Sequence, residues 1–283
     1  MFRPGAGMLA YRCESASRML KDFESSLSVS RPIARDLPGT SIAFADGAFE
    51  VVVSRLDVGP DAFRALAALL SDAERERASR FAFDRDRNRF IAARARLREL
   101  LAARMGVPPE SVELTYGVHG KPSLARRFAY SDLRFNVSHC DDIAVYAFSC
   151  GREIGIDVEA VRVIPDADDL AARFFSDREN DAYLALDRRD KPQGFFNCWT
   201  RKEAFIKALG DGLYHALDSF EVSLAPGEPA RILRVESTPG GRCGWRMESF
   251  SPSPGFVAAV VTEHFRPKVR SGRARGNSRA ARK

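Results

Sequence analysis

Long apolar runs and patterned cysteines are both missing from this chain of 283 residues. No stretch reaches the length of a membrane span, and residues 1–30 contain no continuous apolar run that would serve as a secretion signal. The five cysteines show no C-x-x-C spacing and stand at positions 13, 140, 150, 198 and 243. An odd number of scattered thiols predicts a reducing compartment. We therefore expect a soluble, cytoplasmic protein and no disulfide framework.

Acidic residues are absent between Arg266 and Lys283, where eight Lys or Arg residues stand. The formal net charge of the whole chain is +6, so the rest of it is slightly acidic. We expect this tail to be disordered and solubilising, with a weak contact to a polyanion or partner as the alternative. A specific nucleic-acid binder is disfavoured, because the body also lacks a recognisable nucleic-acid motif.

Hydrophobic periodicity predicts an α+β fold, in which strands and helices occur in mixed order. Strands are expected at residues 48–56, 111–116, 132–137, 143–149, 153–161, 218–224, 230–235, 244–250 and 256–263. Helices are expected at residues 61–70, 86–105, 166–174, 176–187 and 195–209. A Ser71–Glu74 capping box should open one further helix.

The motif Arg-Phe-x-x-Asp-Arg at residues 80–85 recurs at residues 173–178, and we expect a long helix after each copy. This internal echo predicts two related lobes that meet near residue 150, with a ligand cleft between them. The expected division is a weakly structured extension at 1–42, an N-terminal lobe at 43–151, a C-terminal lobe at 152–264 and a disordered basic tail at 265–283.

Apolar and polar residues alternate in Ile154-Gly155-Ile156-Asp157-Val158-Glu159. On a strand, Asp157 and Glu159 project from one face while Ile156 and Val158 face the other side. Two carboxylates on one face suit Mg²⁺, which completes its coordination with water and phosphate oxygens. The alternative is a solvated strand edge.

The amphipathic helix expected at 195–209 ends at Gly210 and carries Trp199, Glu203 and Lys207 four residues apart. This spacing places all three on one helix face, next to the apolar stripe. Glu203 and Lys207 can be an ordinary surface ion pair. They can also be half of a site for a metal and a phosphate.

Three further segments carry polar groups suited to phosphate. Phe135-Asn136-Val137-Ser138-His139 ends a strand in a polar elbow, where His139 is either structural or a phosphate donor. His119-Gly120-Lys121-Pro122 offers a glycine for close backbone approach and a lysine as a point charge. Nine arginines between residues 75 and 98, Arg94 among them, form mostly a solvated face from which one or two could bind phosphate.

Taken in this order, the segments Gly-Lys-Pro, Phe-Asn-Val-Ser-His, Ile-Gly-Ile-Asp-Val-Glu and Trp-Thr-Arg-Lys-Glu-Ala-Phe-Ile-Lys resemble the 4′-phosphopantetheinyl transferases of the surfactin-synthetase type. The resemblance spans about residues 45–262. It implies a pseudo-twofold α+β fold, in which each lobe packs a small, largely antiparallel sheet on a long helix. It also implies a Mg²⁺-dependent enzyme that moves the phosphopantetheine arm of coenzyme A to a serine of an apo acyl or peptidyl carrier protein, releasing adenosine 3′,5′-bisphosphate.

The resemblance also assigns roles to residues by position. The implied metal ligands are Asp157, Glu159 and Glu203, of which Glu203 is also the leading candidate for the catalytic base. The residues implied to contact coenzyme A are Arg77, Arg89, Gly120, Lys121, Pro122, Ser138, His139 and Lys207. Among these, Arg89 and Arg77 are assigned to the 3′-phosphate, and Lys207 and His139 also to catalysis.

Two departures from the family pattern matter. Glu74 stands where a phosphate-binding lysine can occur, so the 3′-phosphate contacts are expected to differ here. His119 replaces an aromatic ring that is common before Gly120. The main alternative is a non-catalytic relative that binds coenzyme A or a carrier protein. By fold analogy we expect a monomer.

Overall fold

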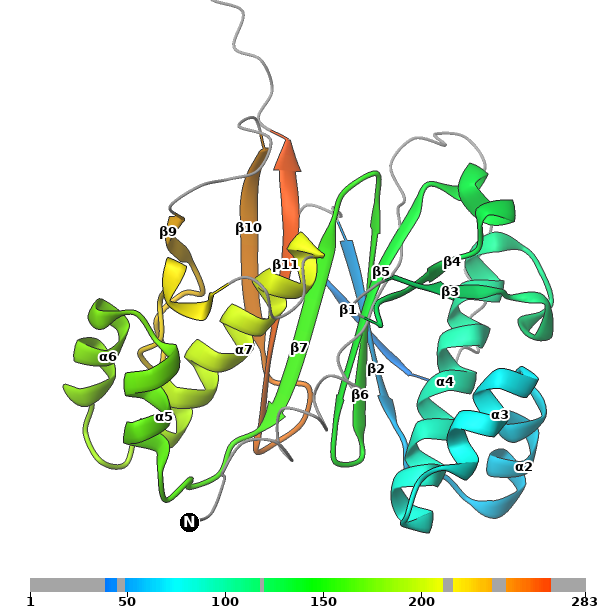
Figure 1. Cartoon of the computed structure of the whole chain (residues 1–283), viewed down its shortest axis with the longest axis horizontal. Helices are drawn as coiled ribbons and strands as arrows, with labels where there is room; N and C mark the ends of the chain where they lie inside the picture. Colours follow the sequence, from blue (N-terminus) through cyan, green and yellow to red (C-terminus); the bar gives the residue numbers. More distant parts are fainter. Residues whose placement is uncertain (1–38, 45–48, 118–119, 211–215, 236–242, 266–283) are drawn as a thin grey trace, which may run out of the picture.

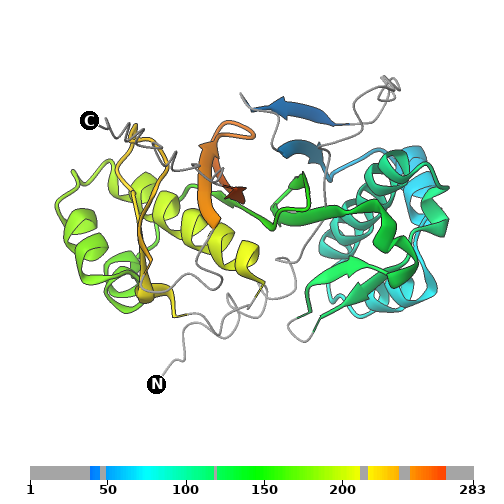
Figure 2. The ribbon, with the colours of Figure 1, turned by 90° about the horizontal axis from the view of Figure 1, so that it is seen from above.

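The computed structural model describes residues 39–44, 49–117, 120–210, 216–235 and 243–265. It confirms the predicted α+β fold, with two lobes that each pack an antiparallel sheet on helices. The helices lie at the two ends of the molecule, and the sheets meet in the middle (Figure 1 and Figure 2). The predicted basic tail, from residue 266 onwards, lies outside the described residues.

The N-terminal lobe contains a four-stranded sheet in the order β1-β2-β6-β5, with every neighbouring pair antiparallel. Its strands are β1 (Thr40–Ala43), β2 (Phe49–Arg55), β5 (Leu133–Cys140) and β6 (Ile143–Cys150). Three helices pack on this lobe: α2 (Pro60–Ala68), α3 (Asp72–Ser79) and α4 (Asp84–Met105). A small hairpin of β3 (Leu114–Tyr116) and β4 (Pro122–Leu124) follows them.

The C-terminal lobe has a three-stranded sheet in the order β10-β11-β7, again antiparallel throughout. Its strands are β7 (Ile154–Ala160), β10 (Cys243–Phe250) and β11 (Phe256–Phe265). Its helices are α5 (Ala167–Phe174), α6 (Asp177–Leu184) and α7 (Lys191–Leu209). A second short hairpin pairs β8 (Phe220–Val222) with β9 (Ile232–Val235).

Two short strands were not expected from the sequence. β1 begins inside the segment predicted as a weakly structured extension at 1–42, and it pairs with β2 at the edge of the sheet. β4 follows the glycine of the β3–β4 hairpin and starts at Pro122. Both are four residues or shorter. Segments of that length show too little alternation for a periodic signal.

The two lobes repeat the same order of helices and strands. The repeated motif that suggested this, at residues 80–85 and 173–178, does not occupy corresponding positions in the two lobes. The second copy, at 173–178, precedes the eight-residue helix α6, so the expectation of a long helix after it was wrong. The true counterpart of the Ser71 capping box on α3 is the Ser176 capping box on α6. Corresponding positions in this region are therefore about 105 residues apart.

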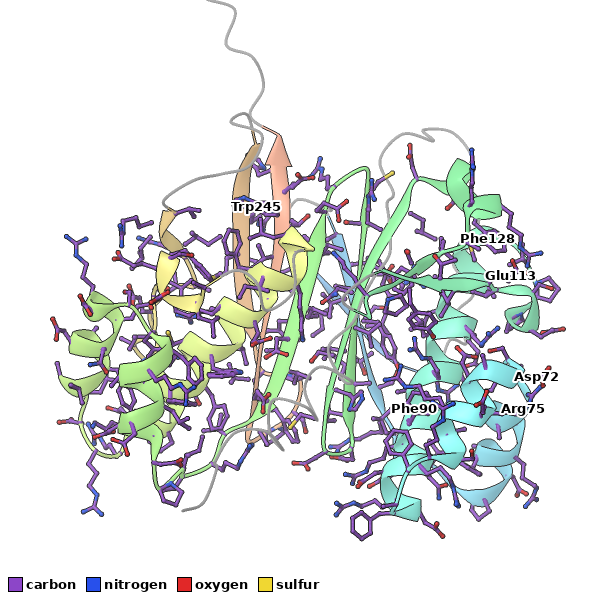
Figure 3. All side chains as sticks on the ribbon, in the orientation of Figure 1. Asp72, Arg75, Phe90, Glu113, Phe128 and Trp245 are labelled. Carbon is purple, nitrogen blue, oxygen red and sulfur yellow. The ribbon has the colours of Figure 1, made fainter. Side chains whose placement is uncertain are left out.

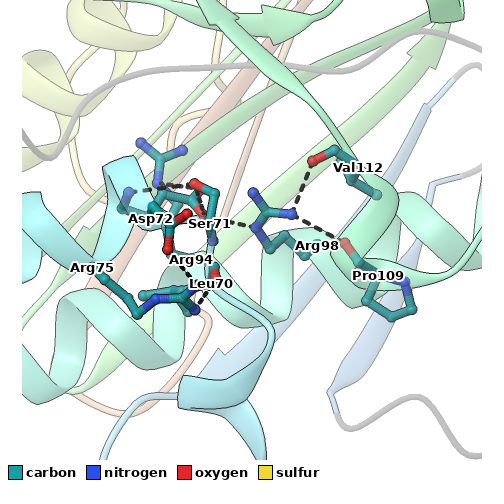
Figure 4. Close-up of polar contacts among 9 residues, drawn as sticks. Leu70, Ser71, Asp72, Arg75, Arg94, Arg98, Pro109 and Val112 are labelled. Atoms are coloured by element: carbon teal, nitrogen blue, oxygen red, sulfur yellow. Dashed lines mark hydrogen bonds and ion pairs between the residues drawn. The ribbon is translucent and has the colours of Figure 1, made fainter.

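Each capping-box glutamate is buried and continues into an ion pair with the long helix of its lobe. Glu74 accepts from Arg98 Nε of α4 at 2.7 Å, and Arg98 also donates to the carbonyls of Pro109 and Val112 (Figure 4). Glu179 lies 2.7 Å from Lys202 Nζ of α7. Lys202 in turn donates to the carbonyl of Leu217, the first residue of the 3₁₀ turn Leu217–Ser219, and to that of Phe220, which follows the turn. In both lobes, an ion pair between the capping-box glutamate and the long helix thus fixes the two helices to each other.

Three apolar clusters hold the molecule together, one inside each lobe and one between the two sheets. In the C-terminal lobe, Trp245 of β10, labelled in Figure 3, lies on the cluster inside that lobe. Its ring packs edge-on against Phe205 of α7 at 5.3 Å between centroids. The cluster between the sheets includes Val51 and Val145 of the N-terminal lobe with Ile156 and Val158 of β7. The lobes are therefore joined by a common core.

We predict that Lys202→Met destabilises the protein by roughly 3–5 kcal/mol, because it leaves the buried Glu179 carboxylate without its cation. Denaturant unfolding would measure the change. Arg178→Ala is the matched control in the same lobe, since its side chain is 82% exposed and should change stability by about 0.5 kcal/mol or less. A Lys202→Met variant as stable as the parent would contradict the proposed role of the ion pair.

Candidate active site

Strands β5 and β7 belong to different sheets, yet side chains join them. Asn136 of β5 is fully buried, and its Oδ1 accepts a hydrogen bond from the backbone N–H of Ile156 at 2.6 Å. Two residues further on, Ser138 Oγ donates to Asp157 Oδ1 at 2.9 Å. These bonds take the place of a backbone ladder between the lobes. They set the end of β5, with Ser138 and His139, beside the acidic face of β7.

On its other side, β7 touches α7 backbone to backbone at Gly155. A Cβ at this position would lie 2.0 Å from the carbonyl oxygen of Ala204 and 2.4 Å from the amide nitrogen of Ala208. Only glycine permits so close an approach. The contact brings Lys207 of α7 to the carboxylate of Asp157.

Lys207 Nζ lies 2.6 Å from Asp157 Oδ1, and both side chains are buried. The ammonium also donates to the carbonyl of Ile156 at 3.2 Å and to Ser138 Oγ at 3.3 Å. Three acceptors thus fix the position of this buried positive charge. The alternative of a solvated surface pair between Glu203 and Lys207 is wrong, because both side chains are buried and Lys207 pairs with Asp157 instead.

The three predicted metal ligands are all nearly buried: Asp157 is 5% exposed, Glu159 7% and Glu203 6%. Glu159 lies 3.8 Å from Arg162 and accepts from the thiol of Cys140 at 3.8 Å. Burial raises the pKa of that thiol to about 12, so Cys140 remains a protonated donor. Carboxylates are rarely this buried unless cations compensate them.

One oxygen of these carboxylates is available to a divalent cation. Asp157 Oδ2 is buried and has no hydrogen-bond partner among the described residues. Carboxylate oxygens are the ligands that Mg²⁺ prefers. Within the described part of the chain no three His, Cys, Asp or Glu side chains are gathered at metal-binding distances. In this arrangement the Lys207 ammonium holds Asp157 Oδ1, which leaves Oδ2 as the unsatisfied oxygen.

His139, at the end of β5, lies in a field of positive charge. Burial, and then the charges of Lys207, Arg94, Arg89 and Arg77, lower the pKa of His139 to about 4. The imidazole is therefore neutral at pH 7 in the ligand-free protein. An anion bound in this region would offset the surrounding positive charge and favour the protonated ring.

The predicted phosphate arginines differ in how they are held. Arg89 of α4 donates from Nε and Nη2 to the two oxygens of Asp57, both at 2.7 Å. This bidentate bond raises the pKa of Arg89 and fixes its guanidinium. Arg77 of α3 lies over the ring of Phe90, 5.5 Å from its centroid.

Arg94 belongs to the same group of cations, but sequence reasoning placed it with the solvated helix face. Its side chain is only 11% exposed. The sequence did contain a signal for this burial. Arg94 follows the core residue Phe90 by four residues, so the two share one face of α4.

The β3–β4 hairpin reaches from the N-terminal lobe to the end of α7. Lys121 Nζ donates to the carbonyl of Lys207 at 3.1 Å, where a cation is favoured by the helix dipole. Gly120 has a φ of 71°, a left-handed conformation that suits glycine. Pro122 is buried in β4. His119 lies outside the described residues.

Comparison with known proteins places this geometry in a family. A family model described as 4′-phosphopantetheinyl transferase superfamily matches residues 153–261, and one described as 4′-phosphopantetheinyl transferase, N-terminal, matches residues 58–151. The 4′-phosphopantetheinyl transferase HetI of a Nostoc species is 40% identical over 210 residues, which cover 74% of this chain and 85% of that protein. This chain belongs to the 4′-phosphopantetheinyl transferase superfamily.

A second relative of this transferase carries the name of the type predicted from the motifs. The 4′-phosphopantetheinyl transferase Sfp of Bacillus subtilis is 28% identical over 197 residues, which cover 70% of this chain and 84% of Sfp. The predicted resemblance is therefore confirmed. None of the helices in the described residues is long and apolar enough to cross a membrane.

We predict that Gly155→Ala lowers the free energy of unfolding by about 3 kcal/mol or more, because the new methyl group meets backbone atoms that cannot move aside. Gly59→Ala is the matched control, since a Cβ there meets nothing within 4 Å and the φ of −65° suits alanine. Because Gly59 is the N-cap of α2, alanine there should cost at most about 1 kcal/mol in denaturant unfolding, clearly less than Gly155→Ala. Equal stability of both variants would contradict the close contact between β7 and α7.

A second prediction concerns pH. Because the pKa of His139 is about 4 in the folded state and about 6.5 when unfolded, the unfolded chain binds nearly one more proton between these values. The ligand-free protein should therefore lose stability as pH falls from about 6.5 to about 4. Denaturant unfolding of the parent and of His139→Gln across this window would test this. The variant should show a shallower loss, and identical pH dependence would refute the assignment.

Proposed function

We propose that this 4′-phosphopantetheinyl transferase transfers the phosphopantetheine arm of coenzyme A to a serine of an apo carrier protein. The buried cluster of Asp157, Lys207 and Ser138, where β5 of one lobe meets β7 of the other, carries the proposal. A fixed positive charge, a hydroxyl and a carboxylate with an unsatisfied oxygen are the groups that a pyrophosphate and a metal ion require. The names of HetI and Sfp support the same reaction.

In the proposed reaction, the serine oxygen of the carrier forms a bond to the β-phosphorus of coenzyme A. The bond from this phosphorus to the bridging oxygen breaks, and adenosine 3′,5′-bisphosphate leaves with that oxygen. Lys207 and His139 supply positive charge or hydrogen-bond donors to the phosphate oxygens. Glu203, nearly buried on α7 one turn before Lys207, accepts the proton of the serine hydroxyl.

Asp157, Glu159 and Glu203 would hold Mg²⁺. A bound Mg²⁺ would neutralise charge on the pyrophosphate. The residues proposed to contact coenzyme A are those predicted from the sequence, from Arg77 and Arg89 through the Gly120–Pro122 segment to Ser138. In the ligand-free structure Asp57 already holds Arg89 in a single orientation, so little ordering remains when a phosphate binds.

The reactants of the proposed reaction indicate the partner protein and the cell compartment. The partner would be an apo acyl or peptidyl carrier protein, and the use of coenzyme A supports a cytoplasmic enzyme. A monomer is sufficient, since one chain supplies both β5 and β7. The candidate in which the protein only binds coenzyme A or a carrier is disfavoured, because three nearly buried carboxylates would serve no purpose there.

The test is to incubate the protein with coenzyme A, Mg²⁺ and an apo carrier protein, and to follow the mass of the intact carrier. We expect Asp157→Asn and Glu203→Gln to remain folded and to lose transfer by roughly 100-fold or more, the effect of removing a group that stabilises transition-state charge. Asp169→Asn, at an exposed position on α5, is the control and should keep the parent rate. Full transfer by either site variant would overturn the site. Binding of coenzyme A without any transfer would favour the non-catalytic alternative.

A further inference from the structure

Side chains on one face of β5 contact β7, although the two strands are edge strands of different sheets (Figure 1). They belong to alternate residues of β5, namely Arg134, Asn136, Ser138 and Cys140. Arg134 pairs with Glu153, which precedes β7, and the last two residues of the row reach the acids of β7. Asn136 is 0% exposed and bonds the main chain of β7 through its side-chain oxygen. The proposed reaction assigns no role to this buried side chain.

The main chain of Ile156, which Asn136 contacts, leads directly into the proposed metal ligand Asp157. In the described part of the chain β7 is an edge strand, so its main-chain groups on the side away from β11 are not paired with a further strand. Side chains bond those of Ile156 instead. Its N–H donates to Asn136 Oδ1 at 2.6 Å, and its carbonyl accepts from Lys207 Nζ at 3.2 Å. The main chain just before Asp157 is therefore held by β5 and by α7.

Asparagine suits this position because its oxygen accepts a hydrogen bond without bringing a charge. Ile156 is fully buried, so its N–H requires an acceptor inside the protein. An aspartate would supply one, but it would also place a second buried carboxylate near Asp157, and like charges in the interior repel strongly. The Nδ2 atom of Asn136 has no hydrogen-bond partner among the described residues, which costs stability. The gain at this position is therefore the neutral acceptor for Ile156.

We propose that Asn136 is a positioning residue for the transfer reaction: through the main chain of Ile156 it fixes the Asp157 carboxylate, whose Oδ2 is available to Mg²⁺. The inference rests on the proposed function. Because Asn136 is fully buried, it acts through Asp157 rather than on the substrate. Removing a group that orients a metal ligand commonly lowers metal affinity or activity by about 10- to 100-fold. The proposed contacts of Arg77 and Arg89 with coenzyme A do not pass through this hydrogen bond, so they should persist without it.

The experiment compares the parent enzyme with Asn136→Leu, which keeps the size of the side chain but lacks the acceptor. We expect kcat, measured from the mass of the intact carrier, to fall about 10-fold or more, and KM for coenzyme A to change by less than about 3-fold. A second readout needs no turnover. With coenzyme A present and the carrier absent, Mn²⁺ in place of Mg²⁺ should bind about 10-fold more weakly in a paramagnetic resonance titration.

Asn197→Leu is the matched control. Asn197 of α7 is also buried, and its side chain donates to the carbonyl of Leu224 at 3.0 Å within the C-terminal lobe. This variant loses a buried hydrogen bond, so it should be less stable than the parent. Its kcat, its KM for coenzyme A and its affinity for Mn²⁺ should stay at the parent values.

The outcomes separate the inference from the proposed function. Absence of transfer by the parent enzyme would defeat both. Transfer by the parent, with kcat and Mn²⁺ affinity unaltered in Asn136→Leu, would overturn the inference alone. Equal losses in Asn136→Leu and Asn197→Leu would also overturn it, because any buried asparagine would then act through stability.

Asn136→Ser provides the same test with a milder change, because a water molecule can bridge the shorter side chain to Ile156. Its kcat should fall by a smaller factor than that of Asn136→Leu, again with KM for coenzyme A near the parent value. A raised KM with an unaltered kcat would contradict the positioning role.

Discussion

The contact between the backbones of β7 and α7 at Gly155 is the constraint on which the rest of the site depends. With no side chain between them, strand and helix are close enough for Lys207 to reach Asp157 at 2.6 Å. The opposite face of the same strand, with Ile156 and Val158, forms part of the apolar core between the sheets. One strand thus anchors the two lobes to each other and presents the acids.

The two lobes repeat one order of helices and strands, but the proposed acidic site lies in only one of them. The strands β2 and β7 both have seven residues and lead into corresponding helices. At the positions of Asp157 and Glu159, β2 carries Val52 and Ser54, which cannot form the same cluster of carboxylates. At the other junction between the lobes, Arg246 of β10 lies over the ring of Phe49. These differences are the reason that we propose one active site in this molecule of two similar lobes.

Local patterns in the sequence predicted most of the elements and the acidic face of β7, because periodicity and caps are local properties. They missed β1 and β4, which are too short to show a period, and they aligned the duplication on the wrong hexapeptide. The remaining features that the sequence did not predict depend on tertiary contacts. Glu74 is committed to the buried capping box and to its ion pair with Arg98 of α4, which no local pattern announces.

The central claim is that the junction of β5 and β7 is the site of the reaction. A crystal structure with coenzyme A and Mg²⁺ would test it most directly. The account predicts the metal ion on the carboxylate of Asp157, through the oxygen that has no partner among the described residues, and the pyrophosphate beside Lys207 and His139. A ligand bound at the opposite junction, near Arg246 and Phe49, or a metal ion away from Asp157, would contradict it.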